Sequence, residues 1–102
     1  MTANPARGEA MIAGHVLRPS FAALVAAEQE LGPLFALVER AAAGELRLTE
    51  MVALFWHCLR DHADHTGADI GREIFAEQVT DAGLAAATPA LKILLGQILG
   101  GR

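Results

Sequence analysis

The densest group of side chains that could do chemistry lies between residues 58 and 65. Cysteine, aspartate and histidine recur there four residues apart, and residues with that spacing share one side of an α-helix. One helix could therefore present a thiol–imidazole or carboxylate–imidazole pair to a metal ion such as zinc. A structural zinc site takes four ligands, so an exposed polar helix face is the favoured interpretation. The metal-ligand candidates are Cys58, Asp61, His62 and His65.

Nucleophilic catalysis has weaker support in this sequence. Cys58 is the single cysteine, and it lies in an apolar helical stretch where a thiol usually packs without reacting. Ser20 is the single serine, and its place before an apolar helical pattern is typical of an N-cap. No glycine-rich loop is followed by the lysine of a phosphate-binding loop. We therefore expect no enzymatic activity, no catalytic residue and no cofactor.

The composition favours one small helical domain that positions these side chains. The chain has 102 residues, of which 53% are apolar and 20% are charged, with a net charge of −4. This length suits a single domain over residues 1–102. Abundant alanine and leucine, without tyrosine, favour helices over sheet. The acidic balance argues against a nucleic-acid-binding face, and no apolar run approaches the roughly 18 residues of a membrane span. A single cysteine fits a cytoplasmic location.

The N-terminal region predicts a β-hairpin. Residues 1–6 are small and polar, and we expect them to be frayed. Ala13 and Gly14 form a turn signal between two apolar stretches, which predicts a hairpin over residues 7–18. An isolated hairpin is marginally stable in water, so this one must pack against helices.

The remainder of the chain, residues 20–99, predicts four to five short helices. Together with the hairpin, these helices make the predicted fold class α+β. Capping residues and helix breakers set the expected helix ends. The predicted helices begin after Ser20, at Pro33, after Thr49, after Asp69 and after Thr88. The third is expected to span residues 50–65, and the last, which starts at Pro89, residues 89–99.

Two stretches, residues 50–59 and 89–99, carry more large apolar side chains than one packed face requires. For the first, a central buried helix and a binding surface are both open interpretations. In the second, we expect Ile93 to lie opposite the apolar face and Leu99 to lie beside it, which favours an interface. The predicted partner-binding residues are Trp56, Ile93, Leu95 and Leu99.

An ordered series of short motifs covers nearly the whole chain. The motifs are Asn4-Pro5-Ala6-Arg7-Gly8-Glu9, Leu17-Arg18-Pro19-Ser20-Phe21, Gly44-Glu45-Leu46, Phe55-Trp56-His57-Cys58-Leu59, Ala82-Gly83-Leu84 and Pro89-Ala90-Leu91. In this order and at this chain length, the series resembles the phage tail assembly chaperones of the gene transfer agent type.

The resemblance implies a protein-binding role in the cytoplasm of a bacterial host. Chaperones of this type are thought to keep the tape-measure protein soluble while the tail tube polymerises around it. The implied partner is therefore the tape-measure protein, and the tail tube protein and a second copy of the chain are further possible partners. Two alternatives stay open: a structural component of the tail or tail tube, and a metal-binding protein that uses His62 and His65. The family supplies no catalytic motif.

Overall fold

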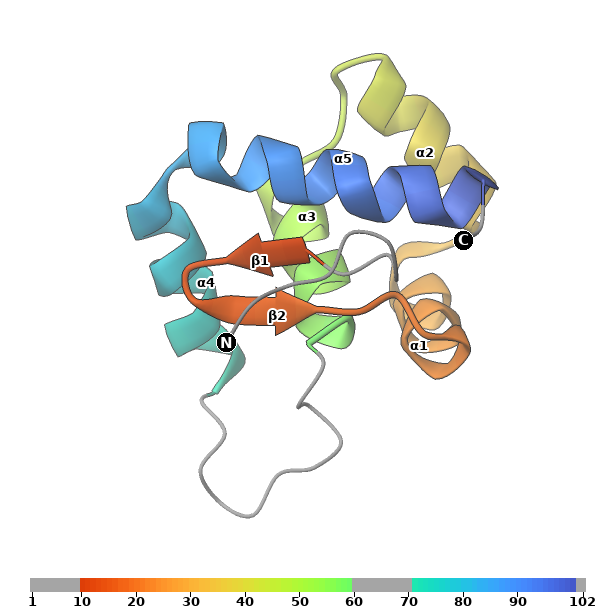
Figure 1. Ribbon diagram of the computed structural model, residues 1–102. Coiled ribbons are helices and arrows are strands. Elements are labelled where there is room, and N and C mark those ends of the chain that lie inside the picture. Colours follow the sequence, from red (N-terminus) through yellow and green to blue (C-terminus); the bar gives the residue numbers. More distant parts are fainter. Residues whose placement is uncertain (1–9, 60–70, 101–102) are drawn as a thin grey trace.

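The computed structural model describes residues 10–59 and 71–100, which form a β-hairpin followed by five helices (Figure 1). The predicted α+β fold, an N-terminal hairpin on a small bundle of short helices, is confirmed. The predictions for residues 1–6 and for the polar stretch 60–65 lie outside the described residues. The elements are β1 (Ala10–Ile12), β2 (His15–Leu17), α1 (Phe21–Leu31), α2 (Leu34–Ala42), α3 (Leu48–His57), α4 (Arg72–Ala82) and α5 (Leu84–Gly100).

The hairpin turns where the sequence predicts. β1 and β2 are antiparallel, and Ile12 pairs with His15 across a two-residue turn. Ala13 and Gly14 have φ angles of 52° and 83°, so both lie in the left-handed region that a type I′ turn requires. β2 also pairs with the chain just after α3. Leu17 forms an isolated antiparallel bridge with Leu59, and the Arg18 N–H donates to the Cys58 carbonyl oxygen at 2.6 Å.

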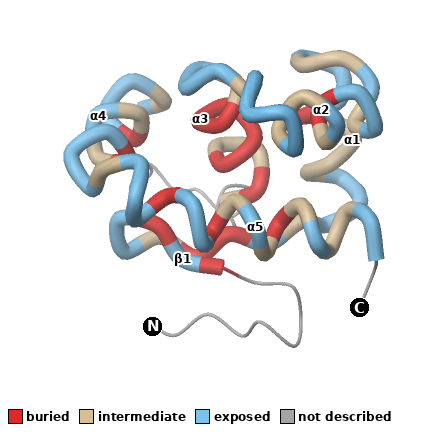
Figure 2. The backbone as a smooth tube through the Cα atoms, turned by 90° about the horizontal axis from the view of Figure 1, so that it is seen from above, coloured by how far each residue is buried: buried red, intermediate tan, exposed pale blue. Residues whose placement is uncertain are grey.

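Helix α3 is the centre of the core. Figure 2 shows it between α4 on one side and α1 and α2 on the other, with buried residues along its length. The five successive residues from Met51 to Phe55 are all buried, and so is Cys58. Of the two interpretations that the sequence leaves open for residues 50–59, the central buried helix is the one that the structure shows.

Both ends of α3 differ from the prediction. The helix begins at Leu48 rather than after Thr49, because the Glu50 carboxylate accepts a hydrogen bond from the Arg47 backbone N–H at 3.1 Å and so caps the first turn. It ends at His57 rather than continuing to residue 65. The reason is a contact with a distant part of the chain. The Cys58 carbonyl oxygen accepts a hydrogen bond from the backbone N–H of Arg18, directly after β2, so the chain turns away from the helical path at Cys58.

Helices α4 and α5 also begin elsewhere than predicted. α4 begins at Arg72, with Gly71 as its N-cap in an extended conformation (ψ 158°). The predicted cap, Asp69, lies outside the described residues. α5 begins at Leu84, directly after Gly83, so the start predicted at Thr88 and Pro89 is wrong.

A proline inside α5 is tolerated for a local reason. Proline lacks the N–H that would bond the carbonyl four residues earlier, and for Pro89 that carbonyl belongs to the exposed Ala85. The alanine-rich first turn has high helix propensity. The Thr88 hydroxyl donates to the Leu84 carbonyl oxygen at 2.7 Å, which satisfies another acceptor of that turn.

Two predicted helix faces are also corrected. On α1 the helical spacing predicts Phe21 on the same side as Leu24 and Leu31. The structure instead places Leu24, Ala27 and Leu31 on the inward face and leaves Phe21 85% exposed. On α5 the inward face carries Ala87, Ala90 and Leu94, and Ile93, which was expected on the opposite side, packs against the core. In α5 the small alanines, rather than the largest side chains, define the packed face.

Candidate functional site

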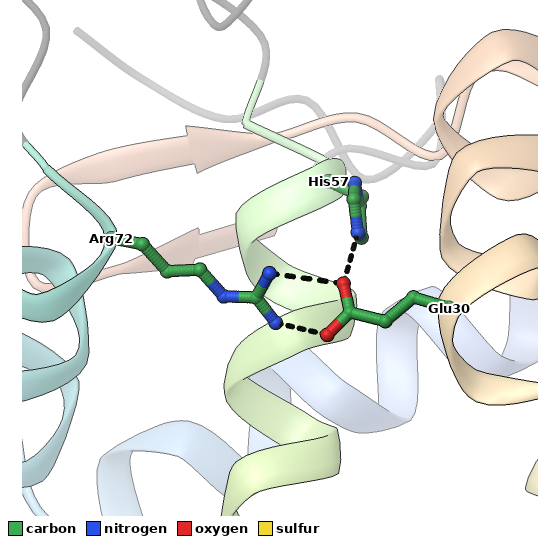
Figure 3. Close-up of polar contacts among 3 residues, drawn as sticks. All are labelled: Glu30, His57 and Arg72. Atoms are coloured by element: carbon green, nitrogen blue, oxygen red, sulfur yellow. Dashed lines mark hydrogen bonds and ion pairs between the residues drawn. The ribbon is translucent and has the colours of Figure 1, made fainter.

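The main polar cluster of the described chain joins three helices through one carboxylate (Figure 3). Glu30 lies near the end of α1, His57 is the last residue of α3, and Arg72 is the first residue of α4. His57 Nε2 lies 2.7 Å from Glu30 Oε1. The Arg72 guanidinium donates through Nη1 to Oε1 at 2.9 Å and through Nη2 to Oε2 at 2.5 Å. Both carboxylate oxygens are therefore occupied by partners from other helices.

The chemistry of this cluster is that of a structural cross-link. The hydrogen bonds from Arg72 and then from His57 lower the pKa of Glu30 from 4.5 to about 2. A carboxylate with such a pKa is a weak base near neutral pH. The adjacent Cys58 thiol is buried, and desolvation raises its pKa to about 12. A protonated thiol in that environment is a poor nucleophile, so these residues hold helices together rather than react.

The predicted metal ligands are only partly within the described structure. Cys58 is buried at the end of α3, whereas Asp61, His62 and His65 lie outside the described residues. Within residues 10–59 and 71–100, no group of three or more histidine, cysteine, aspartate or glutamate side chains could hold a metal ion. The metal-binding alternative therefore stays a prediction.

Two further polar contacts position the elements around α3. The Arg40 guanidinium pairs with the Glu50 carboxylate and joins α2 to α3. His15 Nε2 lies 2.6 Å from Gln78 Oε1, and its ring meets Phe75 edge-on with centroids 5.3 Å apart, which joins the hairpin to α4. Local sequence spacing does not reveal these pairs, because their partners lie ten or more residues apart.

The four predicted partner-binding residues differ in exposure. Trp56 is partly buried against the core, with its ring 6.0 Å from that of Phe75. Ile93 is also partly buried against the core, and Leu95 is half-buried. Leu99 is 60% exposed. The structure thus leaves Leu99, at the end of α5, as the most accessible of the four, and their binding role stays a prediction.

Helix α5 presents an unusual face to solvent. We call its exposed residues at helical spacing, namely Ala85, Thr88, Lys92, Gly96 and Leu99, the α5 outer stripe. Lys92 is the one charged residue among the 17 residues of α5. The exposed face of a surface helix is normally rich in charged residues. The α5 outer stripe is therefore an accessible surface of small and apolar side chains.

Two phenylalanines are also exposed, at the starts of α1 and α2. Phe21 is 85% exposed and Phe35 is 76% exposed, whereas Phe55 and Phe75 are fully buried. Phe35 is not among the residues predicted to bind a partner. The signal that could have found it is its position on α2, off the side that contains the buried Leu37.

No single helix within the described ranges has the length and apolar character to cross a membrane. Two pairs of consecutive helices, α1 with α2 and α4 with α5, meet that test together, but they are bent by 77° and 111°.

A family model described as "Phage tail tube protein, GTA-gp10" matches residues 8–101, which is nearly the whole chain. Searches of curated proteins and of solved structures give no significant match.

Proposed function

This chain belongs to the phage tail tube protein, GTA-gp10, family, and we propose that it acts as a structural component of a phage-like tail or tail tube. The observation that carries the proposal is the α5 outer stripe. A subunit of an assembly exposes apolar surface as a monomer and buries it against its neighbours. The family description favours this role over the assembly chaperone that the sequence resemblance implies.

The shape of the α5 outer stripe suits close packing against another protein. Ala85, Thr88 and Gly96 have small side chains, so a partner helix or strand can approach the α5 backbone closely. Leu99 supplies a large apolar side chain at one end of the stripe. Lys92 adds a single positive charge, which would set orientation rather than affinity.

The first test is the composition of purified tail particles. We expect the chain to be present in them at a fixed ratio to the other tail proteins, measured by quantitative mass spectrometry. Leu99→Asp would place a charge in the interface and lower that ratio. Ile74→Asp is the matched control, because Ile74 is 52% exposed on α4 and lies outside the stripe. Particles that lack the chain would contradict the structural role.

A second candidate function is the tail assembly chaperone, and the helical form of the stripe favours it. An exposed apolar helix face binds a partner helix readily, and the tape-measure protein is the implied helical partner. Co-expression should then raise the solubility of the tape-measure protein, and Leu99→Asp should reduce the amount that co-purifies. In this case the chain would be absent from finished particles. The same mass spectrometry therefore separates the two candidates.

A further inference from the structure

We propose that α5 is a detachable arm, which swings away from β1 and α4 as one unit about Gly83 while the rest of the fold stays intact. The proposal does not rest on the proposed function, although it concerns the helix that carries the α5 outer stripe. It starts from a difference in how the elements are held. Hydrogen bonds and ion pairs join the other helices and the hairpin to one another, whereas α5 packs through apolar contacts.

Each of the other elements has a polar cross-link to a neighbour. The cluster around Glu30 joins α1, α3 and α4, and the ion pair of Arg40 with Glu50 joins α2 to α3. The hairpin is bonded to α4 through His15 and Gln78. These bonds break when the elements that they join separate, so they make the hairpin and the helices from α1 to α4 one connected unit.

No such bond reaches α5 in the part of the chain that the structure describes. The Thr88 hydroxyl of α5 donates to the Leu84 carbonyl oxygen of the same helix. Its other long polar side chains, Lys92 and Gln97, make no hydrogen bond or ion pair with the described residues. The backbone bonds at the start of α5 are also local, because they run to the Gly83 carbonyl oxygen. Detaching α5 therefore breaks no hydrogen bond between described elements.

The apolar contacts of α5 are also small for a helix of its length. α5 runs along one side of the fold and packs mainly against β1 and α4 (Figure 1). Three of its 17 residues are buried, and in two of these, Ala87 and Ala90, the side chain is a single methyl group. The third, Leu94, is fully buried. Hydrophobic stabilisation scales with the apolar area removed from water, so α5 is held less firmly than α3, in which five successive residues are buried.

A hinge lies where α5 begins. Gly83 has a φ angle of 92°, in the left-handed region that favours glycine, and α4 and α5 meet there at an angle of 111°. A Cβ at Gly83 would meet no atom within 4 Å, so no neighbouring side chain restrains rotation there. The next three residues, 84–86, are exposed. α5 can therefore turn about Gly83 without displacing α4.

Detachment changes what α5 offers to another protein. In the docked form a partner reaches the α5 outer stripe, whereas in the open form Ala87, Ala90 and Leu94 are accessible as well. With one charged residue among 17, the open helix is apolar around most of its circumference, which suits an apolar helical partner. A partner that binds the inner side binds the open form alone, so it shifts the population towards that form.

Hydrogen exchange of the full-length chain at increasing urea concentrations tests the arm. The probes are the amides of residues 91–95, in the middle of α5, and the slowest amides of α3. A detached helix of 17 residues is marginally stable in water, so opening exposes the α5 amides to exchange. We expect them to exchange at least about tenfold faster than the α3 amides, with a weaker dependence on urea, because opening exposes less surface than unfolding.

A matched pair of substitutions separates the hinge from a general loss of stability. Gly83→Ala and Gly32→Ala place the same methyl group at φ angles of 92° and 90°, and neither meets an atom within 4 Å. Both should speed exchange in α3, because unfolding relieves the strain of an alanine at such a φ. Gly83→Ala should also speed exchange in α5 about tenfold, since opening relieves the strain at the hinge. Gly32→Ala, between α1 and α2, should leave the α5 rate unchanged.

Two results would overturn the proposal. The first is an equal rate and an equal urea dependence for α3 and the middle of α5, which would make the whole fold one cooperative unit. The second is an α5 rate that Gly32→Ala raises as much as Gly83→Ala does. Circular dichroism checks that both variants are folded, and the wild-type rates alone can give the first result. Neither result bears on the presence of the chain in tail particles, so this proposal and the proposed function fail separately.

Discussion

Helices α3 and α5 look alike in the sequence and differ in the structure. Both are rich in large apolar residues, and neither pattern alone shows how many sides are covered. α3 has neighbours on every side, so its residues from Met51 to Phe55 are all buried. α5 packs through Ala87, Ala90 and Leu94, and its opposite side remains open. A surplus of apolar residues therefore identifies a binding surface only on a helix at the edge of the fold.

The largest expected effect is a cavity at the centre of α3. Phe55 is fully buried, so Phe55→Ala should lower the free energy of unfolding by about 3–5 kcal/mol. A loss of that size is a large part of the total stability of a small domain. Urea denaturation followed by circular dichroism measures it. A loss below about 1 kcal/mol would mean that α3 is not the centre of the core.

A second pair of substitutions compares the two sides of α5. Leu94 is fully buried and Leu99 is 60% exposed. We expect Leu94→Ala to lower the free energy of unfolding by about 2–5 kcal/mol and Leu99→Ala to change it by less than about 0.5 kcal/mol. The same urea titration measures both variants. Equal losses at the two positions would show that α5 is covered on both sides and would remove the basis for the α5 outer stripe.

The parts of this fold that follow from local chemistry could be predicted from the sequence. The turn at Ala13 and Gly14 needs left-handed conformations, and the Ser20 cap needs only its own first turn. The end of α3 could not be predicted, because it depends on a hydrogen bond between Arg18 and Cys58, 40 residues apart. The start of α5 was missed because proline usually marks a first turn, whereas Pro89 lies within the helix.

The candidate site could be predicted less well than the fold. Leu99 was expected at an interface and is exposed, but Ile93 and Trp56 pack against the core. Periodicity within one helix does not show which side the neighbouring elements cover. The Glu30 cluster could not be predicted for a related reason, since its three members come from three helices.

The smallest expected effect concerns that cluster, which ties the end of α3 to α1 and α4 and leaves α5 untouched. Glu30→Gln removes the charge that Arg72 and His57 share, and it should lower the free energy of unfolding by about 1 kcal/mol at neutral pH, because the group is solvent-accessible. Added salt should shrink this difference. Glu77→Gln is the matched control, since Glu77 is an exposed glutamate of α4 without an ion pair among the described residues.

The pH dependence distinguishes an ion pair from simple packing. The folded pKa of Glu30, about 2, lies below its ordinary value of 4.5, so the folded state binds the proton less readily than the unfolded chain. The contribution of Glu30 to stability is therefore fully present above pH 4.5 and is lost as the pH falls towards 2. Urea titrations of the wild type and Glu30→Gln across this range should converge at the acid end. A difference that stays constant with pH would mean that Glu30 acts through packing rather than as the charged partner of Arg72 and His57.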